Sequence, residues 1–266
     1  MAFVKSLFTF LLIALGAYAA LVAILYVSQR AILYPGADAG APIGERWGEA
    51  VAIGTPDGET LFGLHSAALT GRPSVLSFLG NADRVGNYGF LARALSARGI
   101  GLLAISYRGY PGSTGTPSEQ GLLVDGLAAF DWLTALGDGP VVLLGQSLGS
   151  GVAVNTAVER PAAAVVLVSP YLSVQSLAQA HYPFLPVSLL ISDPFRSDLR
   201  IGSVRQPKLF VHGRLDRVIP LSSGEALYAI APDPKSFLIY DDAGHNDVWN
   251  KDLTDEIVRF IESSGP

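Results

Sequence analysis

A short apolar run followed by a glycine-flanked serine constrains this chain more than any other feature. Residues 141–144 (VVLL) are fully apolar, the motif GQSLG follows at 145–149, and residues 150–160 have a helix-compatible composition. A serine between small residues at a sharp strand-to-helix turn is lifted out of the sheet onto a helix N-terminus, where amide groups and the helix dipole favour negative charge. The stretch therefore predicts that Ser147 is a nucleophile. A glycine-rich packing turn is the simpler alternative.

The N-terminus carries a second strong signal, a long uncharged segment. Residues 6–29 contain no charged side chain, and residues 7–27 are almost continuously apolar. At about 1.5 Å per residue this run is about 30 Å long, which matches the hydrocarbon core of a bilayer. The AYA sequence at 17–19 is compatible with signal-peptidase cleavage, but the apolar sequence continues beyond it, which favours an uncleaved anchor. A buried globular helix is the third interpretation, and balanced positive charges on the two sides leave the membrane orientation open.

Apolar and amphipathic segments alternate through the rest of the chain. We expect strands at 49–54, 60–67, 74–79, 101–106, 141–144, 163–168, 207–212 and 235–240, and helices at 88–98, 118–136, 150–160, 223–230 and 253–261. This alternation on short loops predicts an α/β fold, a mostly parallel central sheet flanked by helices. The first two strands should form an antiparallel hairpin on one edge. Residues 171–206 have no single period, and we expect a small excursion that lines a binding cleft, or else a surface loop.

An elbow serine of this kind requires an acid and then a histidine later in the chain, at the carboxyl ends of strands. Asp216 follows the apolar run 207–212 on a glycine-containing loop, and His245 follows the run 235–240 on another. We therefore expect Ser147 to attack the substrate, His245 to take its proton, and Asp216 to orient the imidazole and stabilise its charged form. The oxyanion should be bound by the N–H of Leu148 and by the N–H of Asn81, which follows the third strand.

Other residues of the same types fit these roles less well. His212 lies within an apolar run, which is typical of a structural, hydrogen-bonded histidine. His65 and His181 lie in the first hairpin and in the irregular segment. Several acids flank His245 so closely in sequence that they rarely reach the required geometry: Asp241, Asp242 and Asp247. The alternative serines are not at an elbow apex: Ser113 and Ser150.

The composition excludes several other kinds of chemistry. The net charge is −5 and lysine and arginine form no cluster, so nucleic acid is not expected as a partner. The chain has no cysteine, which excludes disulfides, thiolate catalysis and cysteine-ligated zinc, and its four histidines lack metal-site spacing. Gly137 and Gly139 precede a strand, and Val142 stands where a dinucleotide fingerprint has its third glycine. We predict neither a cofactor nor a metal.

Several motifs together resemble the α/β-hydrolase superfamily, and within it a membrane-anchored group with one N-terminal helix and little or no cap. The group occurs in bacteria and as eukaryotic serine hydrolases that include depalmitoylating thioesterases. The matching segments extend over nearly the whole chain: QR to YP at 29–35, GNA at 80–82, YRGY at 107–110, GTPSE at 115–119, the elbow, HGRLD at 212–216 and GHN at 244–246. Relatives usually carry a histidine where this chain has Leu79. The resemblance implies that this histidine supports the oxyanion loop, so its replacement puts the shape of that loop in question.

We therefore expect an α/β-hydrolase fold with an N-terminal transmembrane helix, divided into an anchor (1–29), a tether (30–45) and a hydrolase domain (46–266). The expected function is that of a membrane-anchored serine hydrolase that cleaves carboxylic esters or thioesters, with a small or lipid-like substrate, through an acyl-enzyme. A serine peptidase of the same fold and a non-catalytic membrane-tethered binding protein are the alternatives. Secretion after signal cleavage is the alternative location. The natural substrate, its chain length and the oligomeric state do not follow from the sequence.

Overall fold

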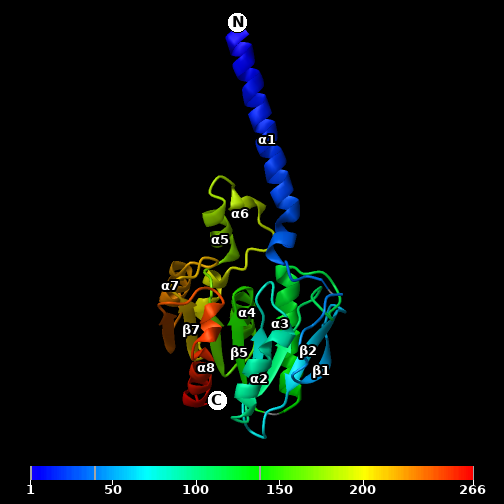
Figure 1. Ribbon diagram of the computed structural model, residues 1–266, viewed down its shortest axis with the longest axis vertical. Helices are drawn as coiled ribbons and strands as arrows, with labels where there is room; N and C mark the ends of the chain where they lie inside the picture. The colour runs from blue at the N-terminus through cyan, green and yellow to red at the C-terminus, as the bar shows by residue number, and fades with distance from the viewer. Residues whose placement is uncertain (1, 39, 138, 266) are drawn as a thin grey trace.

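A long N-terminal helix stands on an α/β domain in the computed structural model (Figure 1). The structure describes residues 2–38, 40–137 and 139–265, so the outer limits of the predicted anchor and hydrolase domain, residues 1 and 266, lie outside it. The first helix, α1, extends over Ala2–Leu33. The predicted boundary between anchor and tether, at residues 29 and 30, therefore falls within a helix.

An eight-stranded sheet forms the centre of the domain, in the order β1-β2-β4-β3-β5-β6-β7-β8. Its strands are β1 Glu49–Gly54, β2 Thr60–Ser66, β3 Ser74–Phe78, β4 Gly101–Ile105, β5 Val141–Gln146, β6 Ala164–Val168, β7 Lys208–Gly213 and β8 Lys235–Tyr240. β2 pairs antiparallel with β1 and with β4, and the other neighbours are parallel. The first hairpin thus lies at one edge of a mostly parallel sheet, as the sequence predicts.

Helices flank the sheet, which confirms the predicted fold class (Figure 1). They are α2 Gly89–Ser96, α3 Glu119–Ala135, α4 Leu148–Glu159, α5 Val174–His181, α6 Val187–Leu190, α7 Leu221–Ile230 and α8 Leu253–Ser263, with short 3₁₀ turns at η1 Val85–Tyr88, η2 Ser197–Leu199, η3 Ile201–Ser203 and η4 Asp247–Asn250. α3 packs against α4, and α2 packs against α8. Ser118 caps the start of α3, because its hydroxyl accepts a hydrogen bond of 3.1 Å from the Gly121 N–H.

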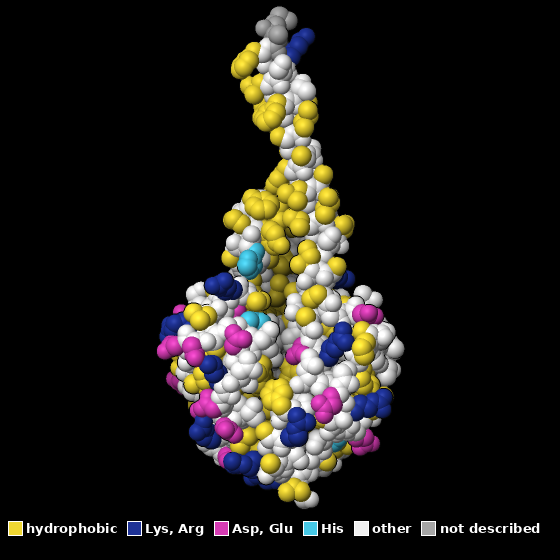
Figure 2. All heavy atoms as spheres, viewed as in Figure 1, with side chains coloured by type: hydrophobic (Ala, Val, Ile, Leu, Met, Phe, Trp, Pro, Cys, Tyr) yellow, Lys and Arg dark blue, Asp and Glu magenta, His cyan; other side chains and the backbone are white. Residues whose placement is uncertain are grey.

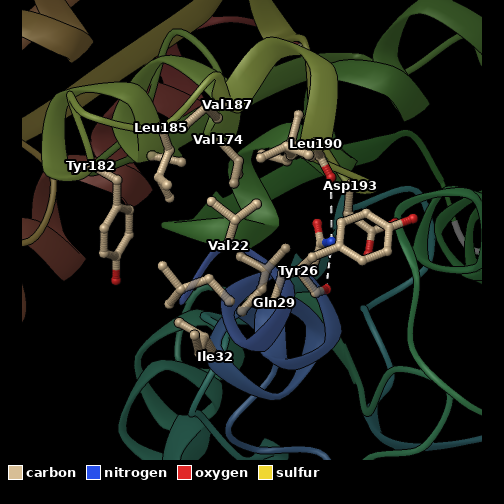
Figure 3. A pocket seen from close by; sticks show the side chains of 14 residues that line it. Val22, Tyr26, Gln29, Ile32, Val174, Tyr182, Leu185, Val187, Leu190 and Asp193 are labelled. Atoms are coloured by element: carbon tan, nitrogen blue, oxygen red, sulfur yellow. Dashed lines mark hydrogen bonds between the residues drawn. The ribbon is translucent and has the colours of Figure 1, made fainter. Parts of the chain in front are cut away.

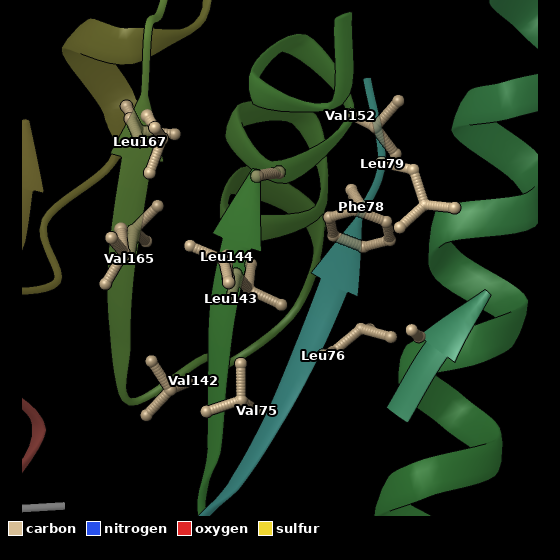
Figure 4. Packing of buried hydrophobic residues seen from close by; sticks show 14 of the residues in the cluster. Val75, Leu76, Phe78, Leu79, Val142, Leu143, Leu144, Val152, Val165 and Leu167 are labelled. Carbon is tan, nitrogen blue, oxygen red and sulfur yellow. The ribbon is translucent and has the colours of Figure 1, made fainter. Parts of the chain in front are cut away.

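The central strands are mostly apolar because they are covered on both faces. Every residue of β3, β4, β5 and β6 is buried. Figure 4 shows side chains of these strands packed together, with Phe78 of β3 and Val152 of α4 close to one another. A parallel sheet between two helical layers explains why these segments are largely apolar and show no regular alternation of apolar and polar residues. The buried sheet fixes the positions of the loops at its carboxyl edge, where the candidate site lies.

Arg108, in the YRGY segment that follows β4, forms ion pairs with two aspartates. The Arg108 guanidinium donates to the carboxylate of Asp125, at 2.8 Å, and to that of Asp57, at 2.7 Å. The Asp125 side chain is fully buried, and the Arg108 backbone N–H donates to it as well, at 2.9 Å. Two donors from one residue thus compensate the burial of this carboxylate.

Replacing Arg108 with methionine should destabilise the domain strongly. The Asp125 carboxylate would stay buried without its guanidinium, and breaking a buried pair in this way costs about 3–5 kcal/mol. The melting temperature of the detergent-solubilised chain should therefore fall by roughly 10 °C. Arg160→Met is the matched control, since Arg160 pairs with the exposed Asp131 and a surface pair contributes less than about 1 kcal/mol. Equal losses of melting temperature in the two variants would contradict the conclusion that Arg108 compensates a buried carboxylate.

Candidate active site

Ser147 lies at the apex of a tight turn between β5 and α4. Its φ is 51°, a left-handed conformation that is uncommon for a residue other than glycine. The turn is held because the Ser147 N–H donates to the carbonyl oxygen of Val168 at 2.9 Å. Glycine is required on either side, since a Cβ on Gly145 would collide with the backbone of Gly149, and one on Gly149 would collide with the backbone of Phe78. The turn therefore has the geometry that the GQSLG motif predicts.

The structure brings Ser147, His245 and Asp216 together in a hydrogen-bonded chain. The Nε2 atom of His245 lies 3.1 Å from the Ser147 hydroxyl, and Nδ1 lies 2.7 Å from Asp216 Oδ2. The three residues follow β5, β8 and β7, whose carboxyl ends lie at the same edge of the parallel sheet, with β6 between β5 and β7. With the proton on Nδ1, the other ring nitrogen can accept the proton of the serine.

Asp216 is fixed in place and held ionised by its surroundings. Burial acts to raise the pKa of Asp216, but hydrogen bonds from His212, His245 and the Ile219 N–H outweigh it and hold that pKa well below its ordinary value. The second carboxylate oxygen accepts from the N–H groups of Val218 and Ile219, both at 2.8 Å. His212 Nε2 lies 3.5 Å from Asp216 and bonds the Ile219 carbonyl at 2.9 Å, a contact that the sequence alone did not predict.

The rival residues are engaged elsewhere. Asp241 pairs with Arg214 and Asp242 with Lys251, each at 2.7 Å. Asp247 accepts from the Gly244 N–H at 3.0 Å. The remaining candidates also make other contacts or lie away from Ser147: His65 packs edge-on against Trp132, His181 ends α5, the Ser113 hydroxyl bonds the Ser106 carbonyl, and that of Ser150 bonds the Ser147 carbonyl. The geometry thus favours Ser147, His245 and Asp216, whose catalytic roles stay predictions.

The two predicted oxyanion donors lie near the serine. Leu148 is the first residue of α4, and Asn81 follows Gly80, at which an added Cβ would lie 3.8 Å from that of Ser147. Among the hydrogen bonds of the described residues, neither the Leu148 N–H nor the Asn81 N–H has a protein acceptor. Both amides are therefore available to an oxygen atom bound at the serine.

The loop that carries Asn81 is held by groups that sequence reasoning missed. The Tyr107 hydroxyl donates to the Leu79 carbonyl at 3.0 Å, and the Tyr110 hydroxyl donates to the Asn81 carbonyl at 2.7 Å. The end of α1 contributes too, because the Asn81 side chain donates to the Leu33 carbonyl at 3.0 Å. The Leu79 side chain is fully buried in the core. The two tyrosines of the YRGY segment and α1 thus support the loop in which relatives usually have a histidine.

Replacing Asn81 with alanine tests this support. The backbone amide of residue 81 remains, but the hydrogen bond from its side chain to α1 is lost. One such bond contributes roughly 1 kcal/mol, which here helps to hold the oxyanion loop in position. We expect ester turnover to fall by roughly fivefold with an unchanged melting temperature. Gln120→Ala is the control, because it removes an exposed side-chain amide from α3. Equal activities of the Asn81 variant and the parent protein would argue against a positioning role.

A cavity of about 360 Å³ opens at Ser147. Its wall is partly aromatic, and it is lined by Gly80, Asn81, Ala82, Asp83, Asn87, Tyr88, Phe90, Gln146, Ser147, His245, Asn246 and Trp249. Gln146 holds this wall together, since its side-chain oxygen accepts from the Tyr88 hydroxyl at 2.9 Å and from the Trp249 indole at 3.0 Å. Gln146 and Trp249 are 103 positions apart in the sequence, so no local pattern could reveal their contact. Its only sequence signal is the position of Gln146 directly before the serine.

The irregular segment 171–206, which was expected to line a binding cleft, contributes no residue to the lining of this cavity. It contains α5 and α6, which line a separate groove together with α1. α5 ends at His181, just before Pro183. Among the described residues, no group of three or more His, Asp or Glu side chains could hold a metal ion.

Comparison with known proteins agrees with this architecture. The family described as "Serine aminopeptidase, S33" matches residues 71–201. The chain is 37% identical over 252 residues to uncharacterized protein Rv2307c of Mycobacterium tuberculosis, covering 89% of this chain and 88% of that one. It is 35% identical over 192 residues to lysophosphatidylserine lipase ABHD12 of Rattus norvegicus, covering 64% of this chain and 48% of that one. Esterase Pf2001 of Pyrococcus furiosus has a similar fold, with a TM-score of 0.68 at 20% identity over 82% of this chain and 91% of that one.

Proposed function

The chain belongs to the α/β-hydrolase superfamily, and we propose that it is a membrane-anchored serine hydrolase that cleaves carboxylic esters or thioesters. The observation that carries the proposal is the hydrogen-bonded chain from Ser147 through His245 to Asp216, at 3.1 and 2.7 Å. The anchor is inferred from Phe3–Leu33, a helix that is long and apolar enough to cross a bilayer. The most apolar part of this helix is not buried against the rest of the protein.

In the first half of the proposed reaction, the Ser147 oxygen forms a bond to the acyl carbon of the substrate. His245 Nε2 takes the serine proton, and Asp216 stabilises the resulting imidazolium across its short bond to Nδ1. The carbonyl oxygen becomes negatively charged and accepts from the N–H groups of Leu148 and Asn81. The carbonyl re-forms, the bond to the leaving alcohol or thiol breaks, and His245 gives that group its proton.

In the second half, water hydrolyses the acyl-enzyme. His245 takes a proton from the water, whose oxygen bonds to the acyl carbon, and the same two amides bind the oxyanion. The bond to Ser147 then breaks, the serine recovers a proton from His245, and the acid is released. Apart from the substrate and one water molecule, the groups of the chain are enough to balance both halves.

Two features support an ester with an acyl chain as the substrate class. The cavity at the serine has an aromatic wall built by Tyr88, Phe90 and Trp249, with ring centroids 5.4 to 6.5 Å apart, and such surfaces bind apolar groups. ABHD12, whose name gives a lysophospholipid as its substrate, is similar to this chain over residues that span about half of ABHD12. The aminopeptidase description of the matching family makes peptidase activity the second candidate.

A labelling and turnover experiment tests the proposal. The full chain in detergent is treated with a fluorophosphonate probe and assayed on p-nitrophenyl esters from acetyl to palmitoyl, a palmitoyl thioester and amino-acid p-nitroanilides. We expect labelling and ester or thioester turnover. Faster hydrolysis of anilides than of esters would favour a peptidase, and a folded protein that neither labels nor turns over any substrate would be a binding protein.

A further inference from the structure

An apolar groove lies between α1 and the segment that contains α5 and α6 (residues 174–192, called here the α5–α6 hairpin). Figure 3 shows Val22, Tyr26 and Ile32 of α1 facing Val174, Leu185 and Val187 of the hairpin across it. The groove encloses about 190 Å³. In Figure 2 apolar side chains of both elements surround a hollow between them. The groove is therefore a preformed, elongated apolar cavity outside the catalytic cleft.

Polar contacts close the groove at its two ends and leave its middle apolar. At the tip of the hairpin, the Tyr18 hydroxyl donates to the Phe184 carbonyl at 2.9 Å. At the base, Gln29 accepts from the Ser192 N–H at 2.7 Å, and Arg30 pairs with the buried Asp193 at 3.0 Å. The hairpin is thus fixed to α1 at both ends, while the space between is lined by aliphatic and aromatic side chains.

The contact at Tyr18 determines how deep the hairpin reaches. Tyr18 lies within the apolar part of α1, about 22 Å along the helix axis from Leu33. A span of about 20 residues fills the hydrocarbon core, and any such span within Phe3–Leu33 contains Tyr18. Phe184, bonded to Tyr18, therefore lies at the depth of the acyl chains once α1 crosses a bilayer.

The hairpin has the composition and hydrogen bonding that this depth demands. Residues 174–192 contain no Asp, Glu, Lys or Arg, and the side chains of Phe184 and Leu189 are 55% and 83% exposed. Carbonyls in its turn are satisfied by side chains: Tyr18 bonds the one at Phe184, and the Gln179 amide bonds the one at Leu185 at 3.2 Å. Internal pairing of backbone groups is the requirement that a lipid environment imposes.

We propose that the hairpin tip is embedded in the bilayer and that the groove between it and α1 holds one acyl chain of a membrane lipid. A groove lined by aliphatic side chains and open toward hydrocarbon is filled by a lipid chain, because lipid is its surrounding solvent at that depth. Water in the aliphatic middle of the groove would find few partners for its hydrogen bonds, since the polar side chains of Gln29 and Asp193 lie at the base.

The position of the groove also connects it to the proposed reaction, and this step rests on the proposed function. Leu33 lines the base of the groove, and its carbonyl accepts the Asn81 side chain of the oxyanion loop. The same end of α1 thus borders both the groove and the catalytic cleft. An acyl ester lying in the groove would approach Ser147 from the membrane side, so the substrate class is an ester of a long acyl chain drawn from the bilayer.

Depth is measured with fluorescent labels, for which a chain without cysteine is suited. Single variants Phe184→Cys, Leu189→Cys and, as control, Leu69→Cys carry a fluorophore on exposed positions. The full-length proteins are reconstituted into phosphatidylcholine and phosphatidylglycerol vesicles that contain lipids spin-labelled along the acyl chain. We expect strong quenching at 184 and 189 and none at 69. Quenching at none of the three positions would overturn the embedded hairpin.

Groove occupancy is measured by photo-crosslinking with a phosphatidylcholine that carries a diazirine in its palmitoyl chain. We expect crosslinks on Val174, Ala178 and Val187, which line the groove, and expect Ala178→Trp to reduce those on 174 and 187 by at least about fivefold by filling the space. Ala180→Trp, on the same helix at an exposed position, is the matched control and should change neither. Crosslinks confined to exposed residues, or unaffected by Ala178→Trp, would overturn the proposal.

Turnover separates this inference from the proposed function. In vesicles, the ratio of palmitoyl to acetyl ester turnover should fall by about tenfold in Ala178→Trp, the lower end of the effect of one lost methylene contact in an apolar pocket, and stay constant in Ala180→Trp. An unchanged ratio with lost crosslinks would mean that the groove binds lipid without presenting substrate, which overturns the catalytic connection. A parent protein that crosslinks in the groove but cleaves no ester would refute the proposed hydrolase and leave the lipid site intact.

Discussion

Replacing Ser147 with alanine is expected to abolish fluorophosphonate labelling and to reduce kcat for ester hydrolysis by a factor on the order of 10⁴ to 10⁶. Without the hydroxyl, no acyl-enzyme forms, and the remaining rate comes from the two oxyanion amides and from substrate binding alone. The fold should be preserved, because the Ser147 hydroxyl makes one hydrogen bond among the described residues, to His245 Nε2 at 3.1 Å. Circular dichroism and the melting temperature check this.

Ser150→Ala is the matched control for that experiment. Ser150 is buried one turn away, and its hydroxyl donates to the Ser147 carbonyl at 2.7 Å instead of facing the cavity. Its loss should leave labelling intact and lower kcat by less than about tenfold, the cost of one hydrogen bond that supports the turn. Labelling that survives in the Ser147 variant and disappears in the Ser150 variant would refute the assignment of the nucleophile.

The sheet and the three residues at its carboxyl edge could be predicted because their signals are local. The strands β3 to β6 are short, mostly apolar segments, and the turn at Ser147 is encoded by two glycines within five residues. Once the serine was placed, the rule that parallel strands present their functional groups at one edge located the acid and the histidine. Their order along the chain came from the order of the triad that accompanies such an elbow serine. Asp216 and His245 each follow such a strand, and the structure brings them to hydrogen-bonding distance.

What could not be predicted depends on contacts between distant segments. Gln146 meets Trp249 across 103 positions, and Asn81 meets Leu33 across 48, so no periodicity or spacing records either contact. The excursion after β6 was expected to line a binding cleft, but no local pattern indicated that α1 forms the opposite wall of the groove that it lines. A long-range contact of the same kind supports the oxyanion loop, since the Tyr107 hydroxyl donates to the Leu79 carbonyl across 28 positions.

Replacing Asp216 with asparagine should have the second largest effect on activity, a fall in kcat on the order of 10⁴-fold. The side chain keeps its shape, but an amide can donate its N–H to His245 Nδ1 and so favour the tautomer with the proton on Nε2. That tautomer cannot accept the serine proton. Fluorophosphonate labelling should slow in parallel with ester turnover, whereas Asp241→Asn, which alters an exposed acid paired with Arg214, should leave both rates unchanged. Equal rates in the parent and the Asp216 variant would assign the orienting role to another acid.

The same variant should also change how stability depends on pH. The pKa of Asp216 is lowered in the folded protein by its hydrogen bonds to His212, His245 and the Ile219 N–H, which outweigh its burial, so the stabilisation is fully present above the unfolded-state pKa of about 4 and is lost as pH falls toward the folded-state pKa. In that window the unfolded chain binds a proton that the folded chain does not, and the parent loses about 1.4 kcal/mol per pH unit from this group. Asp216→Asn lacks the titrating group, so its melting temperature should lie below that of the parent at neutral pH, and the gap should narrow below about pH 4. A gap that stays constant from neutral to acidic pH would mean that Asp216 is not preferentially ionised in the folded state, which would remove the electrostatic basis for its role beside His245.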